Sequence, residues 1–382
     1  MPDVVIVDAV RTPIGRAGKG SLKEVRADDL GAVPLTALKE RNPDFDFSEV
    51  GDIMYGCAAG VGETGLNVAR NAALLAGMPV TVPAVTVNRF CASSLQTLRM
   101  AFHAIRADEG DVYIAGGVEA VSRNPVDPDW DPHPALDGSA GSAYDVYIPM
   151  GLTAENVAKR YGVSREAQDE WAMTSQQRAV AAREEGHFDK EIVPVVRPDG
   201  EQVTRDDGPR PGTTTEGLAS LRPAFEEGGT VTAGNSCPLN DGAAAVLVMS
   251  EERAAREGMK PKARIIASTV AAIEPEYMGV GPIPAIRALL DRTGVTIDDV
   301  DVIEINEAFA AQIVPCMEEL SIPAEKLNPY GGAIALGHPF GMTGARIMTT
   351  LLNNLERRDG TLGIESMCVA GGMGQAMLVE RL

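Results

Sequence analysis

Reactive side chains in this sequence lie where a predicted strand gives way to a turn or a helix. In VTVNRFCASSLQ (residues 85–96), Cys91 follows a β-rich run and precedes small residues and an amphipathic pattern. A thiol at a helix N-terminus meets unpaired N–H groups and the positive end of the helix dipole, and both favour the thiolate. Cys91 is therefore a candidate nucleophile. The alternative is a buried structural cysteine, a common fate of free thiols.

Two further candidates lie near the C-terminus. His338 stands in NPYGGAIALGHPFGMTGARI (residues 328–347), a loop so rich in glycine that the imidazole can approach a thiol and accept its proton. Cys368 stands in MCVAGGMG (residues 367–374), where a strand enters a glycine turn whose N–H groups can face an oxyanion. The alternatives are a surface-loop histidine and a buried cysteine beside a tight turn.

The fourth candidate is Asn306 in INEAFAAQ (residues 305–312), directly after the strand-like VDVIEI. Its amide can orient a water molecule or a carbonyl group, and the simpler alternative is a helix N-cap. Each of the four candidates follows a predicted strand, and open α/β sheets build their sites at the carboxyl ends of strands. Their shared position predicts one site.

The elements that carry these residues form two similar units. Each unit has a helix, a polar turn, a strand and an Ala-Gly-Gly triplet, at residues 115–117 and 370–372. The apolar faces of the two helices contain Leu95, Leu98, Phe102 and Ile105 in the first, and Ile347, Leu351, Leu352 and Leu355 in the second. The pattern predicts two related α/β halves packed together. The alternative is a chance similarity between two buried strands.

The region between the two units has a different composition and pattern. Residues 122–150 are rich in Pro, Asp, Gly and Ser, residues 151–186 have a strong helical pattern, and residues 197–217 are again polar and rich in Gly and Pro. Thr153 and Ser164 are predicted helix N-caps. We expect an inserted subdomain that covers the first half and carries function, as long ordered loops often do.

Composition narrows the classes of function. The 382 residues contain 34 Lys and Arg against 54 Asp and Glu, so the net charge is −20 and binding to nucleic acid or to an anionic membrane is disfavoured. No apolar run is long enough for a membrane span. The five cysteines are odd in number and lack a C-x-x-C pair, which favours free thiols in a reducing cytoplasm. The four histidines are far apart, so no metal site is expected.

Five motifs together resemble the signatures of the thiolase family, in that family's order. They are VNRFCASSLQ, GNSCPLNDGAAA, NEAFA, GGAIALGHPFGMTGAR and CVAGGMG. YIPMGLTAENVAKRYGVSREAQDEWA resembles the thiolase loop domain, so the similarity covers essentially the whole chain. It implies an α/β fold of two duplicated βαβαβαββ halves, layered α/β/α/β/α, with an inserted loop subdomain. The N-terminal half would then comprise residues 1–121 and 231–258, the insertion 122–230 and the C-terminal half 259–382.

The resemblance also implies an acyltransferase that uses coenzyme A as co-substrate, by a ping-pong route and with no permanently bound cofactor. Cys91 matches the nucleophile that carries the acyl group, and His338 matches the base that activates it. Cys368 matches the second acid/base, and Asn306 the residue that holds a water molecule. The N–H groups of Cys91 and Ala370 match an oxyanion hole.

Residues that bind acyl-CoA and CoA are implied in the same way. Arg210 matches a position near the nucleotide end of CoA. The positions that match the pantetheine and acyl channel are Met150, Ala224, Phe225, Ala233, Met278 and Phe309. Cys237 stands where a pantetheine-contacting serine is common. Two other departures from the family pattern are Ser93-Ser94 in place of Ser-Gly, and Ala370 in place of glycine.

Several alternatives remain within and beyond the family. Cys368 and the NEAF motif argue against a decarboxylating ketosynthase, and the four reactive groups argue against a non-catalytic lipid carrier. Biosynthetic acetoacetyl-CoA thiolases tend to have His-Met-Gly where this chain has Pro149-Met150-Gly151, so we expect a degradative 3-ketoacyl-CoA thiolase of β-oxidation. An acetoacetyl-CoA thiolase is the alternative, and a bulky steroid-type substrate is compatible with the sequence. The family implies a homodimer or homotetramer, built through the strand before Cys91, that is compatible with association with other β-oxidation enzymes.

Overall fold

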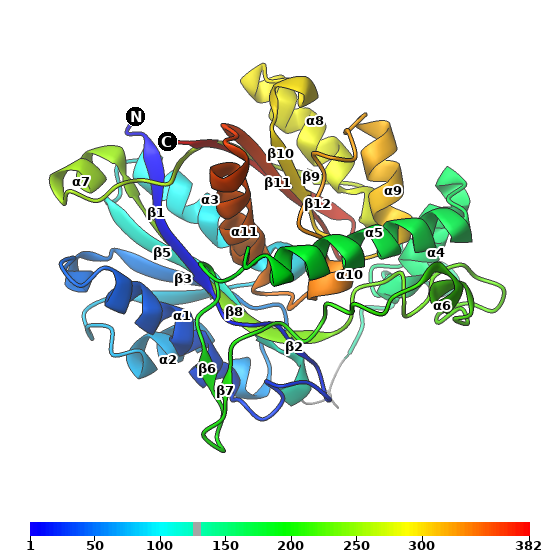
Figure 1. Cartoon of the computed structure of the whole chain (residues 1–382), viewed down its shortest axis with the longest axis horizontal. Helices are drawn as coiled ribbons and strands as arrows, with labels where there is room; N and C mark the ends of the chain where they lie inside the picture. Colours follow the sequence, from blue (N-terminus) through cyan, green and yellow to red (C-terminus); the bar gives the residue numbers. More distant parts are fainter. Residues whose placement is uncertain (125–130) are drawn as a thin grey trace.

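The computed structural model describes residues 1–124 and 131–382; residues 125–130, within the predicted insertion, lie outside the described part. In that part the strands of the main sheet follow the order β10-β11-β12-β9-β1-β8-β5-β3-β4, with β2 (Gly15–Arg16) beside β8 (Figure 1). The elements of the N-terminal half are β1 (Val4–Arg11), α1 (Ala27–Arg41), β3 (Asp52–Gly56), α2 (Val68–Leu75), β4 (Ala84–Val87), α3 (Ser93–Arg106), β5 (Val112–Ala120) and β8 (Asn240–Ser250).

The C-terminal half repeats this order. Its elements are β9 (Ala263–Ala272), α8 (Pro282–Thr293), β10 (Val302–Ile305), α9 (Ala310–Glu319), α10 (Ala333–Leu336), α11 (Thr343–Arg358), β11 (Leu362–Val369) and β12 (Met373–Arg381). In the first half β3 is parallel to β4 and β5, and β8 is antiparallel to β5 and β1. In the second half β10 is parallel to β11, and β12 is antiparallel to β11 and β9. A parallel bridge between Ile303 and Leu327 takes the place of β4. This equivalence confirms the predicted duplication.

Helices α3 and α11 lie together between the two sets of strands, whereas α1 and α2 lie outside one set and α8 and α9 outside the other (Figure 1). The hydrophobic clusters follow the same layers. Leu98 of α3 and Leu351 of α11 share a cluster with Val246 of β8 and Met377 of β12. The two sets of strands join where Val5 and Ile6 of β1 pair with β9. This arrangement confirms the predicted α/β/α/β/α layering.

The two central helices touch through their backbones. A Cβ atom on Gly344 would lie 2.3 Å from the backbone nitrogen of Leu95, so a side chain there is excluded. The N–H of Ala345 donates to Oγ of Ser94 at 2.9 Å. The predicted apolar residues of both helices are buried. The contact therefore holds the N-terminal ends of α3 and α11 side by side.

Two local expectations were wrong. Ala115–Gly117 lies inside β5, whereas Ala370–Gly372 forms the turn between β11 and β12, so the two Ala-Gly-Gly triplets are not equivalent. Thr153 lies within α4 (Met150–Tyr161), and its hydroxyl donates to the Met150 carbonyl. Ser164 does cap α5 (Arg165–Glu184), because its side chain accepts from the Ala167 N–H. A short polar side chain can bond either to the preceding helical turn or at a helix start, and the sequence pattern did not separate the two.

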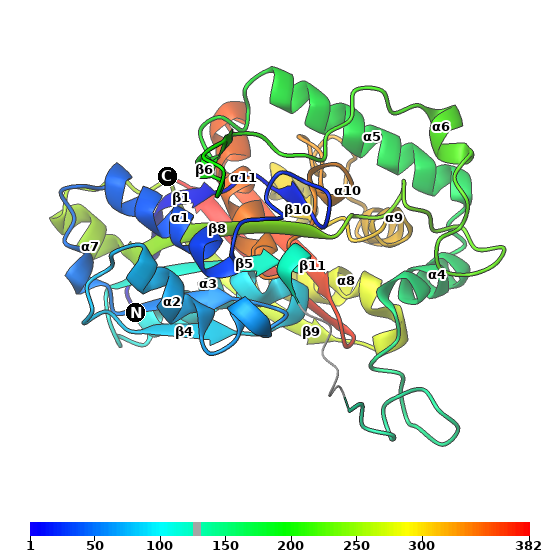
Figure 2. The same cartoon turned by 90° about the horizontal axis from the view of Figure 1, so that it is seen from below.

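The insertion leaves the sheet at the end of β5 and returns at the start of β8, where Ala120 pairs with Asp241. Beyond α4 and α5 it contains β6 (Val195–Val196), β7 (Gln202–Val203) and α6 (Thr215–Ala219). Figure 2 shows α5 running above α9 and α10. Val157 of α4 and Trp171 of α5 share a hydrophobic cluster with Ile313 of α9. Its two long helices thus cover the C-terminal half. Val195 of β6 and Val203 of β7 instead join the hydrophobic cluster of the N-terminal half, so only this later part of the insertion covers the first half as expected.

A buried ion-pair network ties the insertion to the sheet. Arg11, at the end of β1, is fully buried and forms ion pairs of 2.7 Å with Glu191 and with Asp206. Its second contact to Asp206 makes that pair bidentate. Glu191 also accepts from Thr350 and Asn353 of α11. One guanidinium therefore links the N-terminal half, the insertion and, through Glu191, the C-terminal half.

Replacing Arg11 with Met should destabilise the protein by about 3–5 kcal/mol, because two carboxylates stay buried without their cation. Urea unfolding followed by far-UV circular dichroism measures the change. Arg11→Lys, which keeps the charge but loses the planar fork, should recover part of the loss. An unfolding midpoint for Arg11→Met equal to that of the parent would contradict the role of this network.

Candidate active site

Cys91 lies in a single 3-10 turn, Phe90–Ala92, immediately before α3. The turn is held by side chains: Asn88 accepts from the Phe90 N–H, and Ser93 accepts from the Arg89 N–H while donating to the Phe90 carbonyl. Phe90 has a positive φ of 45°, which a non-glycine residue rarely adopts and which marks local strain. Ser93 and Ser94 therefore fix the turn and the helix contact.

Backbone N–H groups surround the sulfur of Cys91. The N–H groups of Ala370 and of Cys91 itself bond to the thiol and favour its ionised form. Burial acts more strongly in the opposite direction and raises the pKa of the Cys91 thiol to about 12. The expectation of a readily ionised thiol at a helix start is therefore wrong for the resting protein. Cys91 is protonated at neutral pH and needs a base.

His338 lies in the loop between α10 and α11, and three polar contacts orient it. Its backbone N–H donates to Oδ1 of Asn240 at 2.9 Å. Its Nδ1 lies 2.7 Å from Oγ1 of Thr343, whose own hydroxyl hydrogen goes to the Pro339 carbonyl. Nδ1 must then carry the hydrogen of that contact, and Nε2 has an unprotonated lone pair. His338 is thus presented as a base through Nε2.

Asn306 faces the same nitrogen. Its Nδ2 lies 3.3 Å from Nε2 of His338, and its buried Oδ1 has no hydrogen-bond partner within the described residues. Burial, with a smaller effect of the Arg346 charge, lowers the pKa of His338 to about 3. The imidazole is therefore neutral at physiological pH. The amide and the imidazole together offer a polar site to a substrate oxygen or a water molecule.

Glu307 supports this pair and was not among the predicted site residues. Its fully buried carboxylate accepts from Trp171 at 3.0 Å, from Ser175 at 2.6 Å and from Asn328 at 2.9 Å, and also from the Ile334 N–H. Burial raises its pKa. The residue after Asn306 thereby fixes α5 and the loop before His338 onto the end of β10. Its place in the NEAF motif was the available signal.

Asn240 and Thr343 were also missed. The sequence signal for Asn240 is its place in the PLNDGAAA motif, and for Thr343 its position five residues after His338. Gly337 has a φ of 110°, and a Cβ there would lie 2.7 Å from the Asn240 amide, so the backbone must approach this side chain closely. Asn240 also donates to the Gly15 carbonyl. These contacts depend on tertiary packing, which a sequence pattern does not specify.

Cys368 is buried near the end of β11, and the turn that follows contains Ala370. Gly371 and Gly372 both have a φ of 77°, whereas Ala370 has no positive φ, so its side chain adds no strain. Burial raises the pKa of Cys368 well above its usual value, and the neighbouring thiols of Cys91, Cys316 and Cys237 act in the same direction. The structure therefore brings Cys91, Cys237, Cys368 and Ala370 together.

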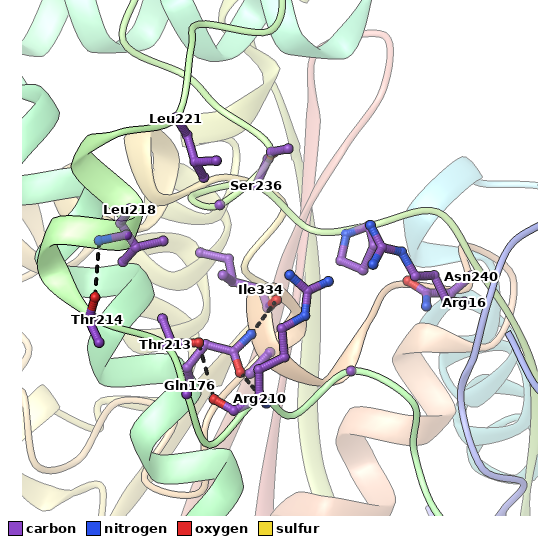
Figure 3. A pocket seen from close by; sticks show the side chains of 17 residues that line it. Arg16, Gln176, Arg210, Thr213, Thr214, Leu218, Leu221, Ser236, Asn240 and Ile334 are labelled. Atoms are coloured by element: carbon purple, nitrogen blue, oxygen red, sulfur yellow. Dashed lines mark hydrogen bonds between the residues drawn. The ribbon is translucent and has the colours of Figure 1, made fainter. Parts of the chain in front are cut away.

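Two of the predicted CoA-binding residues line a cavity of about 490 Å³ (Figure 3). They are Arg210 and Ala233. The other predicted positions lie outside its lining. Phe309 meets the ring of Phe225 edge to face at 6.1 Å and shares a hydrophobic cluster with Met278, against which Met150 packs. Cys237 donates its N–H to the Ala308 carbonyl, and Ala224 donates its N–H to Val231.

A metal site is absent from residues 1–124 and 131–382. No group of three or more His, Cys, Asp or Glu side chains in that part is placed to hold a metal ion. None of its helices is long and apolar enough to cross a membrane. The five cysteines, all of them described, are free thiols.

Comparison with known proteins gives consistent similarities. Residues 4–252 match the family model "Thiolase, N-terminal domain", and residues 259–381 match "Thiolase, C-terminal domain". The chain is 48% identical to a β-ketoadipyl-CoA thiolase of Acinetobacter baylyi and 48% identical to a 3-ketoacyl-CoA thiolase of Cronobacter sakazakii, with full coverage of both chains in each case.

A solved structure is similar over the same length. The crystal structure of the Bacillus anthracis acetyl-CoA acetyltransferase superposes with a TM-score of 0.92 at 40% identity, covering 100% of this chain and 99% of that one. Both halves of the fold, the order of the motifs and the full-length similarity agree. The chain belongs to the thiolase family and is an acyltransferase enzyme.

Proposed function

We propose that this protein cleaves 3-ketoacyl-CoA with CoA, giving acetyl-CoA and a shortened acyl-CoA through a thioester on Cys91, and that it also catalyses the reverse Claisen condensation. One observation carries the assignment of residues. The Ala370 N–H lies near the Cys91 thiol, and the Cys368 thiol is a neighbour of the Cys91 thiol. Asn306 pairs with Nε2 of His338, and its Oδ1 has no partner within the described residues. Two half-reactions need two proton carriers and two oxyanion sites, and these groups supply them.

The first half-reaction begins with the protonated thiol of Cys91. Neutral His338 takes its proton at Nε2, and the thiolate attacks the 3-keto carbon. The N–H groups of Cys91 and Ala370 stabilise the resulting oxyanion. The bond between C2 and C3 then breaks, and its electron pair forms the enolate of acetyl-CoA. His338, now protonated, and a water molecule held by Asn306 stabilise the enolate oxygen, and the thiol of Cys368 protonates the carbon.

The second half-reaction returns the enzyme to its starting state. The Cys368 thiolate takes the proton of the incoming CoA thiol, and the CoA sulfur attacks the acyl carbon on Cys91. The same two N–H groups stabilise this oxyanion. When the thioester collapses, the Cys91 sulfur leaves and recovers its proton from His338. The high pKa of both cysteines fits this cycle, because each serves as a proton donor and as a base.

The degradative assignment has two supports. Pro149 stands at the position where biosynthetic relatives tend to have histidine. The curated relatives described above are named for 3-ketoacyl-CoA and β-ketoadipyl-CoA. Their names favour cleavage of longer 3-ketoacyl-CoA over a strict acetoacetyl-CoA thiolase. A role in β-oxidation, in the cytoplasm, follows from this proposal.

A homo-oligomer is part of the same proposal. β4, which leads to Cys91, lies at the end of the sheet order, and its four residues are only partly buried. Leu66, Leu74, Leu75 and Val80, which lie before β4 in the chain, are exposed apolar side chains. An edge strand with apolar neighbours suits pairing with a second copy. Such pairing would cover the segment that presents the nucleophile.

Replacing Cys91 with Ala should abolish acyl transfer, with a loss of at least about 10⁴-fold in kcat/KM, because no other group can carry the thioester. The rate of 3-ketoacyl-CoA thiolysis is measured in quenched reactions. Mass spectrometry of the parent protein from a quenched reaction detects the acyl adduct on Cys91. Circular dichroism checks the fold of the variant. A folded Cys91→Ala protein with unimpaired thiolysis would exclude this mechanism.

The pH dependence of alkylation tests the protonation of Cys91. Because its pKa is raised to about 12, the thiolate fraction grows with pH, and iodoacetamide labelling should become about tenfold faster per pH unit between about pH 6 and 9. Peptide mass spectrometry, with Cys91→Ala as the control, assigns the label. A plateau near neutral pH would instead indicate a thiol that is already ionised in the resting enzyme.

Chain length distinguishes the degradative from the biosynthetic assignment. Thiolysis of 3-ketoacyl-CoA substrates from four to sixteen acyl carbons, followed by loss of the enolate absorbance, should give flat or rising activity with length. Activity on acetoacetyl-CoA alone would assign the protein to the acetoacetyl-CoA thiolases. No activity across the series with an intact fold would refute a thiolase role on linear substrates.

A further inference from the structure

The cavity that contains Arg210 has an unusual charge balance for this protein. The chain has a net charge of −20, yet the cavity lining contains two arginines, Arg16 and Arg210, and no carboxylate. The other described residues of the lining are uncharged. A positive site in an acidic protein is suited to an anionic ligand.

The two arginines come from opposite sides of the cavity. Arg16 belongs to β2 of the N-terminal half, and Arg210 belongs to the insertion. Figure 3 shows their guanidinium groups pointing toward one another. Within residues 1–124 and 131–382, neither side chain forms an ion pair or a hydrogen bond with another residue. Burial, and to a smaller extent the charge of Arg16, lowers the pKa of Arg210, as expected for two cations held near each other.

The carboxylates of Asp206 and Asp207 bind groups other than the two guanidinium groups of the cavity. Asp206 is bonded to Arg11 and to the Ile14 N–H. Asp207 accepts from the backbone N–H groups of Arg16 and Ser21, so its carboxylate fixes the Arg16 loop from behind. Neither acid lines the cavity. Among the residues that the structure describes, 1–124 and 131–382, the two guanidinium groups are therefore left without a counter-ion.

The backbone that carries each arginine is held in place. The N–H of Ala17 donates to the Leu239 carbonyl, and Arg16 pairs with Asn240 of β8. On the other side, the N–H of Arg210 donates to Oε1 of Gln176, a buried residue of α5. A Cβ on Gly208 would lie 2.1 Å from the Ala335 carbonyl, so this loop lies directly on α10. The backbone on both sides of the cavity is therefore fixed, which lowers the ordering cost of binding an anion to these two residues.

We propose that Arg16 is a second phosphate-binding residue for coenzyme A, which clamps a phosphate group of the CoA nucleotide together with Arg210. The proposal rests on the proposed function, because it takes CoA as the ligand. Guanidinium groups bind phosphate through two parallel hydrogen bonds, and two of them facing each other can hold one phosphate from both sides. Arg16 then contributes to the binding of CoA and takes no part in the chemical steps.

Arg16→Ala should raise the KM for CoA in thiolysis by about tenfold while kcat changes by less than about twofold, since the lost contact is the same in the ground and transition states. The phosphate that Arg16 contacts is identified by measuring KM for three acceptor thiols of decreasing charge: CoA, 3′-dephospho-CoA and pantetheine. With pantetheine, which has no nucleotide, Arg16→Ala and the parent should have the same KM. If the parent and Arg16→Ala have the same KM for 3′-dephospho-CoA, the clamp holds the 3′-phosphate. If their KM values differ for 3′-dephospho-CoA and become equal only for pantetheine, the clamp holds the pyrophosphate.

Lys23→Ala is the matched control, because it removes a positive charge from the same segment at an exposed position outside the cavity lining, and it should leave the KM for CoA unchanged. In the Arg16→Ala, Arg210→Ala double variant, the two effects should be non-additive, because both side chains hold one phosphate. An unchanged KM for CoA in Arg16→Ala overturns the proposal. So does an equal loss with pantetheine, which would indicate a structural role.

Direct binding separates this proposal from the proposed function. Isothermal titration of CoA into the parent and into Arg16→Ala requires no turnover. If the parent cleaves no 3-ketoacyl-CoA but binds CoA about tenfold more tightly than Arg16→Ala does, the clamp stands and the proposed reaction fails. If thiolysis is normal and the two proteins bind CoA equally, the reaction stands and the clamp is refuted.

Discussion

The backbone contact between α3 and α11 determines where the reactive groups can meet. Gly344 lies so close to the backbone of Leu95 that no side chain fits between the two helices. Cys91 lies just before the first helix and His338 just before the second, so the contact that aligns the helix ends also aligns the two loops. The neighbouring bond from the Ala345 N–H to Ser94 prevents one helix from sliding along the other.

Buried charged residues fix the position of the insertion in this fold. Arg11 and Glu307 are both fully buried, and each bonds to several parts of the chain. Arg11 holds the segments around Glu191 and Asp206, and Glu307 holds α5. Hydrophobic contacts alone would permit small shifts of the insertion over the sheets, whereas directed bonds to a buried charge specify one position. The insertion can therefore be long and polar and still present a defined cavity wall.

Much of the architecture follows from local pattern. The apolar faces of α3 and α11 predicted two buried helices. One site was predicted from the placement of Cys91, His338, Cys368 and Asn306 at the ends of strands, but this placement was wrong for His338, which follows α10. The protonation of Cys91 could not be predicted in this way, because burial outweighs the helix-start effect and depends on neighbours distant in sequence. The packing of α5 on the C-terminal half was also not predicted, because it depends on Glu307 and on apolar contacts with α9. The contact of Asn240 with His338 was not predicted either, because the two residues are distant in sequence.

The duplicated halves differ most at one equivalent connection. Between β11 and β12 it is the tight turn that contains Ala370, and between β5 and β8 it is the whole insertion, although both connect antiparallel neighbours. The entropy of closing a loop rises only with the logarithm of its length, so replacing a turn by a subdomain costs the sheet little. After the duplication, one copy of the hairpin could therefore keep its short turn and its fixed N–H group while the other copy was free to lengthen. The site thus combines a short turn with a region in which insertions could accumulate without disturbing the strands beneath them.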